Sequence, residues 1–381
     1  MRTRNITCLA AVAVITATGL ATALPSSATT AHDHLVVRPG ESIQQAVDAA
    51  RPGDTVVVLP GTYRESVLVT TPDLTLTGSG DRTVIMPGTT AGGSAGTTAG
   101  GSAGTTAGGS AGTAAGATVN ACAKGGNGIC VIGTSAKPVG GVHIRSLTVS
   151  GFDKSGIWGS WTDRLSVHKV TTEKNGTWGI AQERSTRGAF RSNTARDNGD
   201  AGIFVANTVD EEDGATDTLG TDIRDNRLTG NRIGVTARRV RNLAIDDNTM
   251  TGNCSGVFVV GDESKPKAGA MTVQDNRIVA NNKFCPETPR LSAIQGTGIV
   301  LTGSESTVVR NNLVQDNVGA TPLSGGIVLF KSFVGAPNTD NAISDNVVRD
   351  NRPADLANRD TGTGNTFTRN ECGTSEPAGM C

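Results

Sequence analysis

Three charged residues, Glu183, Arg184 and Arg238, lie at related positions of a repeating pattern and could act together on an anionic sugar. Guanidinium groups hold a carboxylate through charge-assisted hydrogen bonds, and a neighbouring side-chain base removes the proton beside it. Glycoside hydrolysis would instead need two carboxyl groups about 5 to 9.5 Å apart. Glu183 is the only one of these three residues that carries a carboxyl group. We therefore predict that the three residues catalyse elimination or epimerisation of a uronate.

Aromatic and polar residues close to this group in the repeat would bind a sugar chain. Tryptophan rings stack on the apolar faces of sugar rings, while amide and guanidinium groups bind hydroxyl or carboxylate oxygens. The residues that we predict to bind substrate are Trp158, Trp161, Asn207 and Arg239. The alternative is that the two tryptophans pack under loops and that the charged groups only solvate the surface.

An acidic loop at 210–214 offers hard oxygen ligands of the kind that Ca²⁺ prefers. Its candidate ligands are Asp210, Glu211 and Asp213. The loop does not match the twelve-position calcium-binding loop, so a solvated acidic loop is the alternative. The predicted chemistry requires no cofactor, and Ca²⁺ is the one ion that the sequence suggests.

A repeat positions these residues, because two asparagines five residues apart recur seven times along the second half of the chain. A Gly followed by Ile or Val recurs in phase with them, with tight spacings such as the 22 residues from Gly234 to Gly256. A period of this size, with one turn and one short strand per unit, is typical of a solenoid of stacked rungs. The asparagine pairs are Asn193/Asn198, Asn226/Asn231, Asn248/Asn253, Asn276/Asn281, Asn312/Asn317, Asn346/Asn351 and Asn365/Asn370.

The strands of each rung are too short to bury an apolar side alone, so stacked neighbours must close a shared core. Identical asparagines at the strand spacing can hydrogen-bond into a ladder, and asparagine tolerates the left-handed backbone of a tight turn. We therefore expect the repeated asparagines to be structural rather than functional.

Period-two alternation assigns the two faces of the strand that follows each repeated Gly. We predict that one row of side chains points into the core: Ile157, Ile180, Ile203 and Val235. The rows that point outward are Trp158, Ala181, Phe204 and Thr236 and, two residues later, Ser160, Glu183, Ala206 and Arg238. Insertions lie on both sides of this strand, which predicts that its sheet is the floor of a groove.

The stretch VVRPGESIQQAVDAARPGDTVVVLPGTYRESVLVTTPDLTLTGSGDRTVIMPG, residues 36–88, resembles the opening of right-handed parallel β-helix proteins of the pectate-lyase-like superfamily. The resemblance covers nearly the whole chain after residue 35. It implies an all-β fold, a single-stranded right-handed parallel β-helix of about ten rungs. In this superfamily a short helix covers the first coil, and Ser42 to Ala50 has the apolar spacing for such a capping helix, with Ser42 as the N-cap.

Sugar-acting sites in this superfamily also lie on a sheet between loops. The chain lacks the WIDH motif of pectate lyases and the DPH motif of alginate epimerases. The resemblance is therefore specific for fold, and a β-helix without catalysis is the alternative to an enzyme.

The N-terminal residues 1–31 combine two arginines, a short apolar run and small residues, which predicts a secretory signal peptide. The β-helix domain is expected over residues 35–381, interrupted at 89–117 by a disordered insertion rich in Gly, Ser, Thr and Ala. The mature protein is therefore expected to be secreted, monomeric and free of the membrane. The formal net charge of −1 disfavours a nucleic-acid partner.

Six cysteines follow the predicted signal peptide, and an even number in an exported chain predicts disulfides. Cys254 follows the corner at Asn253, and Cys285 lies just beyond the same corner one rung later, so these two cysteines are expected to pair. The other expected pairs close short loops at the two ends of the stack: Cys122–Cys130 and Cys372–Cys381.

Together these patterns predict a secreted β-helix protein that binds an extracellular acidic polysaccharide and cleaves or epimerises it. The alternative is a non-catalytic structural or glycan-binding protein of a surface or matrix. The two differ in whether the charged side chains converge on one concave floor.

Overall fold

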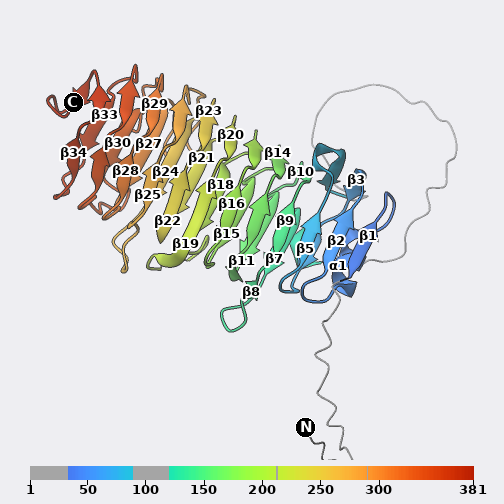
Figure 1. Cartoon of the computed structure of the whole chain (residues 1–381). Coiled ribbons are helices and arrows are strands. Elements are labelled where there is room, and N and C mark those ends of the chain that lie inside the picture. The colour runs from blue at the N-terminus through green and yellow to red at the C-terminus, as the bar shows by residue number, and fades with distance from the viewer. Residues whose placement is uncertain (1–32, 89–119, 212, 290) are drawn as a thin grey trace, which may run out of the picture. The chain divides into compact units, whose positions relative to one another are not determined.

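The computed structural model describes residues 33–88, 120–211, 213–289 and 291–381, which form one compact unit, Asp33–Cys381. The predicted signal peptide at 1–31 and the predicted disordered insertion at 89–117 lie outside the described residues. All the long sheets are parallel, and their strands follow one another along the stack in chain order (Figure 1).

Three parallel sheets run along the stack, because each coil of the chain contributes one strand to each sheet. Sheet A contains β1 (His34–Val37), β2 (Thr55–Val58), β5 (Thr75–Thr77), β9 (His143–Arg145), β13 (Ser166–His168), β16 (Ala189–Arg191), β19 (Thr216–Arg224), β22 (Val240–Asp246), β25 (Thr272–Gln274), β28 (Val308–Arg310), β31 (Ala342–Ser344) and β34 (Thr366–Thr368). Sheet B contains β3 (Gly61–Arg64), β6 (Thr83–Met86), β10 (Thr148–Ser150), β14 (Thr171–Glu173), β17 (Thr194–Arg196), β20 (Arg227–Thr229), β23 (Thr249–Thr251), β26 (Arg277–Val279), β29 (Leu313–Gln315), β32 (Val347–Arg349) and β35 (Glu371–Cys372).

Sheet C is formed by the strands that follow the repeated Gly, and its outer face is the predicted groove floor. Its strands are β4 (Val67–Val69), β7 (Ile129–Ile132), β11 (Ile157–Ser160), β15 (Ile180–Glu183), β18 (Ala201–Ala206), β21 (Ile233–Arg238), β24 (Ser255–Val260), β27 (Thr297–Thr302), β30 (Gly325–Phe330), β33 (Leu356–Arg359) and β36 (Ser375–Glu376). A separate two-stranded sheet pairs β8 (Val139–Gly140) with β12 (Thr162–Asp163).

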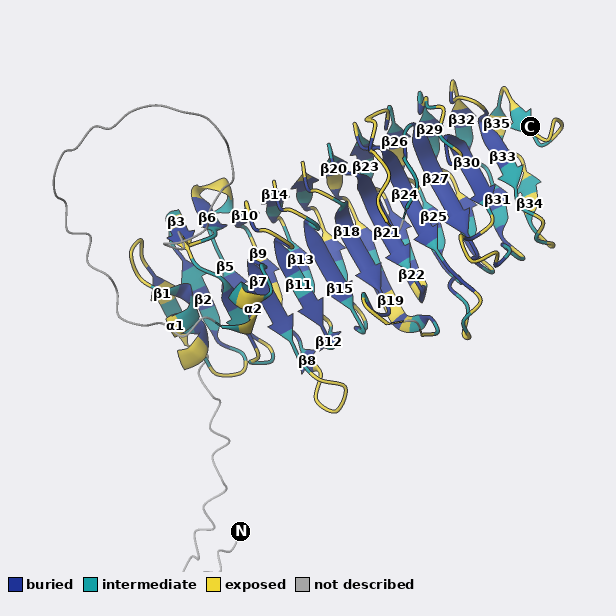
Figure 2. Ribbon diagram, turned by 180° about the vertical axis from the view of Figure 1, so that it is seen from behind, coloured by how far each residue is buried: buried dark blue, intermediate teal, exposed yellow. Residues whose placement is uncertain are grey.

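The interior of the coil is filled by apolar side chains that repeat at the same register position in every coil. The pairing of β11, β15, β18 and β21 aligns the four predicted inward residues, and each has no exposed surface. Figure 2 shows buried strands along the stack, with most exposed residues in the connecting turns. The predicted inward row is therefore confirmed: Ile157, Ile180, Ile203 and Val235.

Two asparagine ladders run along corners of the coil, as the repeat predicted. In each ladder the backbone N–H and Nδ2 of one asparagine donate to Oδ1 of the asparagine one coil later; from Asn248 to Asn276 these bonds measure 2.9 and 3.0 Å. Asn276 Nδ2 also donates to the carbonyl of Ile245 at 2.9 Å. The first ladder runs through Asn193, Asn226, Asn248, Asn276, Asn312, Asn346 and Asn370. The second runs through Asn175, Asn198, Asn231, Asn253, Asn281, Asn317 and Asn351.

The left-handed backbone lies one residue before each ladder position, which corrects the reason that the sequence suggested for asparagine. Asp225, Asp247 and Asp275 have φ angles of 54°, 53° and 55°, whereas the described asparagines that follow them do not have positive φ. Short polar side chains tolerate this conformation by bonding locally. Asparagine occupies the corner instead because its amide both donates and accepts, which the ladder requires of every member.

Two short α-helices and one 3₁₀-helix, Gly80–Arg82, complete the described secondary structure. Helix α1 (Ile43–Ala49) begins after Ser42, whose side chain accepts a hydrogen bond from the backbone of Gln45, as an N-cap does. The helix buries Ile43 and Val47 and packs against β1, β2 and β4. Helix α2 (Ala121–Lys124) precedes β7.

Three disulfides are present, and they are the three pairs that the sequence predicted: Cys122–Cys130, Cys254–Cys285 and Cys372–Cys381. The second of these ties the start of β24 to the insertion that precedes β27. This insertion forms part of the groove described below.

Replacing a central ladder asparagine should destabilise the stack much more than replacing a terminal one. Asn276→Ala leaves the buried backbone N–H of Asn248 without its partner and removes the Nδ2 bonds to the Ile245 carbonyl and to Asn312 Oδ1. Each buried polar group left unpaired costs about 1 to 3 kcal/mol. Asn370→Ala, at the partly exposed end of the same ladder, is the control, because water can replace its bonds. Urea unfolding followed by circular dichroism measures both, and equal losses would contradict a ladder role.

Candidate functional site

The outer face of sheet C carries a second apolar cluster, distinct from the interior of the coil. The register aligns the predicted outward row and extends it through Phe258, Val300 and Val328. Phe204 and Phe258 are only 4% and 2% exposed although they point away from the interior, because insertions on both edges of the sheet fold over them. The outer face of this sheet is therefore a covered floor.

Aromatic rings form a continuous stack along this floor. Trp158 and Trp178 have ring centroids 5.7 Å apart and planes inclined by 16°. Trp178 and Phe204 follow at 4.4 Å and 12°. The stack crosses three coils. Trp178 and Phe204, at one end of the stack, line a cavity.

A cavity of about 910 Å³ lies on the outer face of sheet C. Its floor is Phe204, Thr236 and Phe258, on adjacent strands β18, β21 and β24. Three insertions supply its sides: the first wall (207–211), the second wall (282–289 with 291–296) and the third wall (331–336). The other lining residues are Trp178, Gly199, Asp200, Val209, Asp210, Glu211, Arg232, Ile233, Arg238, Arg239, Val260, Gly261, Asp262, Thr288, Pro289, Leu291, Thr302, Phe333 and Val334.

The charged residues of this cavity fall into two groups at opposite ends of the strands. Asp200 and Arg232 lie just before β18 and β21, while Arg238 and Arg239 lie at the end of β21 and just after it. At roughly 3.3 Å per residue, the two ends of β21 are about 17 Å apart. The apolar floor separates the two groups.

At the first end, the Asp200 carboxylate accepts a hydrogen bond of 3.0 Å from the indole Nε1 of Trp178. Burial raises the pKa of Asp200 above its usual 3.8, and the Trp178 hydrogen bond and the charge of Arg232 only partly oppose this. Arg232 donates through Nη1 to the carbonyl of Pro286 at 2.8 Å and through Nη2 to that of Ser292 at 3.4 Å. Its Nε has no hydrogen-bond partner among the described residues, and burial lowers the pKa of Arg232.

At the second end, Arg239 and Asp262 form an ion pair, and each residue is 7% exposed. Asp262 also accepts a hydrogen bond from the backbone of Ser264 at 2.9 Å. Because the two charges neutralise each other at this end of the cavity, Arg239 lines it as one half of a buried pair.

The three predicted catalytic residues hold the first wall against the sheet. The carboxylate of Glu183 accepts from the backbone N–H of Val209 at 3.2 Å, and Arg238 donates to the carbonyl of the same residue at 3.1 Å. Arg184 donates to the hydroxyl of Thr208 at 3.1 Å and pairs with Glu211. Of the three, only Arg238 lines the cavity, so the structure does not gather them around one substrate position. Their catalytic assignment stays a prediction.

The residues predicted to bind substrate likewise lie mostly outside the cavity. Trp158 belongs to the aromatic stack, and Trp161 lies beneath the Arg184 guanidinium, 5.5 Å from the ring centroid. Asn207 is 3% exposed and donates through Nδ2 to the carbonyls of Asp213 and Gly214, so it shapes the turn of the first wall. Of the four residues predicted to bind substrate, only Arg239 lines the cavity.

Two of the three acidic residues proposed for Ca²⁺ have partners within the protein. Glu211 pairs with Arg184, and Oδ1 of Asp213 accepts the backbone N–H of Gly214 at 2.7 Å. Asp210 lines the cavity. Within the described ranges no group of three or more His, Cys, Asp or Glu side chains could hold a metal ion. The assignment of these three residues to a calcium site stays a prediction.

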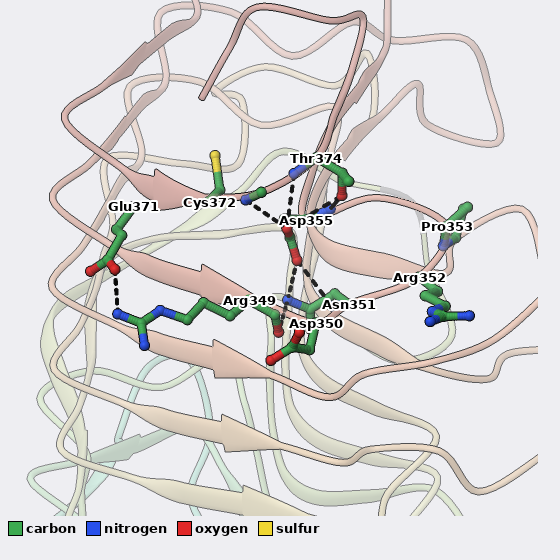
Figure 3. Close-up of a pocket in the computed structure, with 10 residues that line it drawn as sticks. Arg349, Asp350, Asn351, Arg352, Pro353, Asp355, Glu371, Cys372 and Thr374 are labelled. Atoms are coloured by element: carbon green, nitrogen blue, oxygen red, sulfur yellow. Dashed lines mark hydrogen bonds and ion pairs between the residues drawn. The ribbon is translucent and has the colours of Figure 1, made fainter.

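A second cavity of about 640 Å³ lies near the C-terminal end of the stack (Figure 3). At its centre Asp355 accepts hydrogen bonds from the backbone and side chain of Asn351 at 2.9 and 3.0 Å, and from the backbones of Gly373 and Thr374 at 3.0 Å each. Asp355 thus replaces the next asparagine at the end of the second ladder. Its carboxylate serves the fold, so this cavity is not a candidate site.

The cavity residues that sequence reasoning missed are Asp200, Arg232, Phe258 and Asp262. Asp200 and Arg232 occupy the same register position, immediately before the aligned pair Ala201 and Ile233. The repeat therefore predicts that these two residues are neighbours, because each lies just before a sheet C strand. Asp262 had no such signal, because it lies in an insertion beyond the end of β24.

The fold defines a class: a right-handed parallel β-helix of the pectate-lyase-like superfamily, as the sequence resemblance implied. A family described as right handed beta helix region matches residues 214–375. A second family, described as periplasmic copper-binding protein (NosD), matches residues 89–288, more than half of the 381 residues. The chain belongs to this NosD family. No curated protein sequence matches it.

Solved structures of several proteins share the fold at low sequence identity. The A-module of mannuronan C-5 epimerase AlgE4 from Azotobacter vinelandii is 16% identical, with 88% of this chain and 90% of that one covered and a TM-score of 0.52. DFA-IIIase from Arthrobacter chlorophenolicus A6 without its lid is 14% identical, with 83% and 84% covered and a TM-score of 0.52. The catalytic domain of a GH87 alpha-1,3-glucanase is 10% identical, with 93% and 67% covered and a TM-score of 0.51. These likenesses establish the fold alone.

Among the described residues, no group of three or more His, Cys, Asp or Glu side chains could hold the copper ion in the family's description. Copper is held mainly by imidazole, thiolate and thioether groups. The six cysteines of the described part are paired in disulfides. His143 and His168 lie on neighbouring strands but out of register, because His143 pairs with Ser166 and His168 with Arg145. No copper-dependent step follows from this arrangement.

The disulfides and a family described as periplasmic are both consistent with export from the cytoplasm. In the part of the chain that the structure describes, no helix is both long and apolar enough to cross a membrane.

The raised pKa of Asp200 predicts a pH-dependent difference between the wild type and Asp200→Asn. The folded protein binds the Asp200 proton more tightly than the unfolded chain does, so this group favours folding most below pH 3.8. That contribution is lost as the pH rises through the raised pKa. We expect Asp200→Asn, which keeps an acceptor for Trp178, to melt at a higher temperature than the wild type at pH 7 and equally below pH 3.8. Equal melting temperatures at both pH values would contradict the raised pKa.

Proposed function

We propose that this protein is an exported β-helix that binds a polysaccharide in the cavity on the outer face of sheet C. The observation that carries the proposal is the stack of Trp158, Trp178 and Phe204, which leads along the sheet into the cavity. Flat aromatic surfaces bind the apolar faces of sugar rings, and polar groups at the edges bind the hydroxyls. The binding protein is expected to act as a monomer.

The polar groups around the floor suit a ligand that is apolar on one face and hydroxylated at its rim. The hydroxyl of Thr236 lies in the floor between Phe204 and Phe258 and has no hydrogen-bond partner among the described residues. Charged residues are confined to the two ends. Structures that share this fold include a mannuronan epimerase and a glucanase in complex with tetrasaccharides, which supports a carbohydrate ligand by analogy of fold.

The charge of the lining bears on which polysaccharide binds. The sequence predicts an acidic one, but four carboxylates line the cavity against three guanidinium groups, with Asp262 and Arg239 already paired. The carboxylates are Asp200, Asp210, Glu211 and Asp262, and the guanidinium groups are Arg232, Arg238 and Arg239. A cavity without an excess of positive charge does not attract a polyanion. We therefore propose that neutral polysaccharides bind at least as tightly as acidic ones.

Binding is proposed ahead of cleavage or epimerisation because the three predicted catalytic residues are engaged with the first wall. Glu183 and Arg238 both bond to the backbone of Val209, and Arg184 pairs with Glu211. An acid or base must instead reach the proton that it transfers. The lyase or epimerase that the sequence suggested is the second candidate, supported by the epimerase that shares the fold.

Calorimetric titration of the purified protein with dextran, laminarin, galactomannan, alginate and polygalacturonate tests the proposal. We expect saturable binding of at least one neutral polysaccharide, and no rise in absorbance from unsaturated products with either uronate polymer. Absence of binding to all five would contradict the proposed function. Unsaturated product from the wild type, lost in Glu183→Gln, would assign the lyase in its place.

Phe333 on the third wall should contribute to binding, whereas Phe284 should not. Both side chains are exposed, by 54% and 59%, but only Phe333 lines the cavity. Phe333→Ala removes one aromatic contact worth about 1 kcal/mol, so we expect about fivefold weaker binding of the polysaccharide that the titration identifies. Phe284→Ala is the matched control and should bind like the wild type. Equal affinities of the two variants would place the ligand away from the third wall.

A further inference from the structure

Asp200 and Arg232 are neighbours on successive coils, at the end of the cavity where the sheet C strands begin. The backbone N–H groups of Arg232 and Ile233 both donate to the carbonyl of Asp200, at 2.9 and 3.2 Å. The two side chains therefore emerge one strand spacing apart, about 4.8 Å. Both line the cavity beside Trp178, whose ring belongs to the aromatic stack.

The hydrogen-bonding capacity of this pair is only partly used. Asp200 accepts from Trp178 Nε1, and an ionised carboxylate has further lone pairs. Arg232 is 7% exposed, its two terminal nitrogens donate to carbonyls of the second wall, and its Nε–H has no partner among the described residues. A buried donor without a partner costs free energy, which a ligand oxygen would recover. No described hydrogen bond or ion pair joins the two side chains to each other.

We propose that Trp178, Asp200 and Arg232 form a subsite for one neutral sugar unit held by two adjacent hydroxyl groups. Asp200 accepts a hydrogen bond from one hydroxyl, and Arg232 Nε donates to the oxygen of the next. The sugar ring lies beside the edge of Trp178, because the faces of that ring already meet Trp158 and Phe204. This subsite rests on the proposed function, because it requires that a polysaccharide occupies the cavity.

A pair of hydroxyls fits this site better than a charged sugar substituent does. A uronate carboxylate would bring a second negative charge beside Asp200 in a desolvated site, where like charges repel strongly. An amino sugar would bring its positive charge next to Arg232. Adjacent hydroxyls offer one donor and one acceptor without net charge, which matches one acceptor on Asp200 and one donor on Arg232.

Titration of three variants with the tightest-binding neutral polysaccharide among dextran, laminarin and galactomannan tests the subsite. Asp200→Ala should weaken binding about tenfold or more, because it removes an acceptor and leaves the Trp178 N–H unpaired. Asp81→Ala is the matched control, since Asp81 is an exposed carboxylate on the 3₁₀-helix Gly80–Arg82 outside the cavity, and it should bind within about twofold of the wild type. Trp178→Phe, which keeps an aromatic ring but loses the bond to Asp200, should fall between the two.

Partial O-methylation of the polysaccharide supplies a second measurement that a folding defect would not mimic. Methylation removes hydroxyl donors, so it should weaken wild-type binding but add little to the loss in Asp200→Ala. Melting curves at pH 7 show whether each variant is folded. If the wild type binds and Asp200→Ala binds equally well, the subsite is wrong while the proposed function stands. If no polysaccharide binds the wild type, both are wrong.

Discussion

Parallel stacking at the strand spacing is the constraint on which the rest of this structure depends. Strands that mostly have three to six residues cannot bury an apolar face alone, so every coil relies on the coils before and after it. The asparagine ladders impose the same spacing on the corners, because an amide bonds its neighbour only at that separation. Interior, corners and sheets are thus held in one common register, and a side chain at a given position in one coil lies beside its counterpart in the next.

That register explains why the charged side chains on the outer face of sheet C bind the inserted loops. Insertions can leave the stack only at its turns, and they need attachment once they have left it. Glu183, Arg184 and Arg238 provide that attachment for the first wall, while Arg232 and the disulfide between Cys254 and Cys285 provide it for the second. The walls in turn cover Phe204 and Phe258. A shaped cavity on the outer face of sheet C is the outcome of this use of charge.

The sequence predicted most of the fold because the fold is a repetition of local rules. The inward row from Ile157 to Val235, the alignment of Glu183 with Ala206, and the pairing of Cys254 with Cys285 all follow from counting along the repeat. The candidate site was predicted less well because it depends on insertions, which do not obey the repeat. Contacts such as Val209 with Glu183, or Arg239 with Asp262, depend on how each insertion folds back. Asp200 and Arg232 do follow the repeat, because both occupy the position just before the sheet C strand.

The second asparagine ladder is directional, because in every amide–amide bond Nδ2 of one asparagine donates to Oδ1 of the asparagine one coil later. Its aligned amide dipoles add up as the peptide dipoles of an α-helix do, with the positive end at Asn351. Asp355 lies at that end and accepts both N–H groups of Asn351. The carboxylate is therefore to this column what an acidic N-cap is to a helix: an anion that terminates a row of dipoles at its positive end.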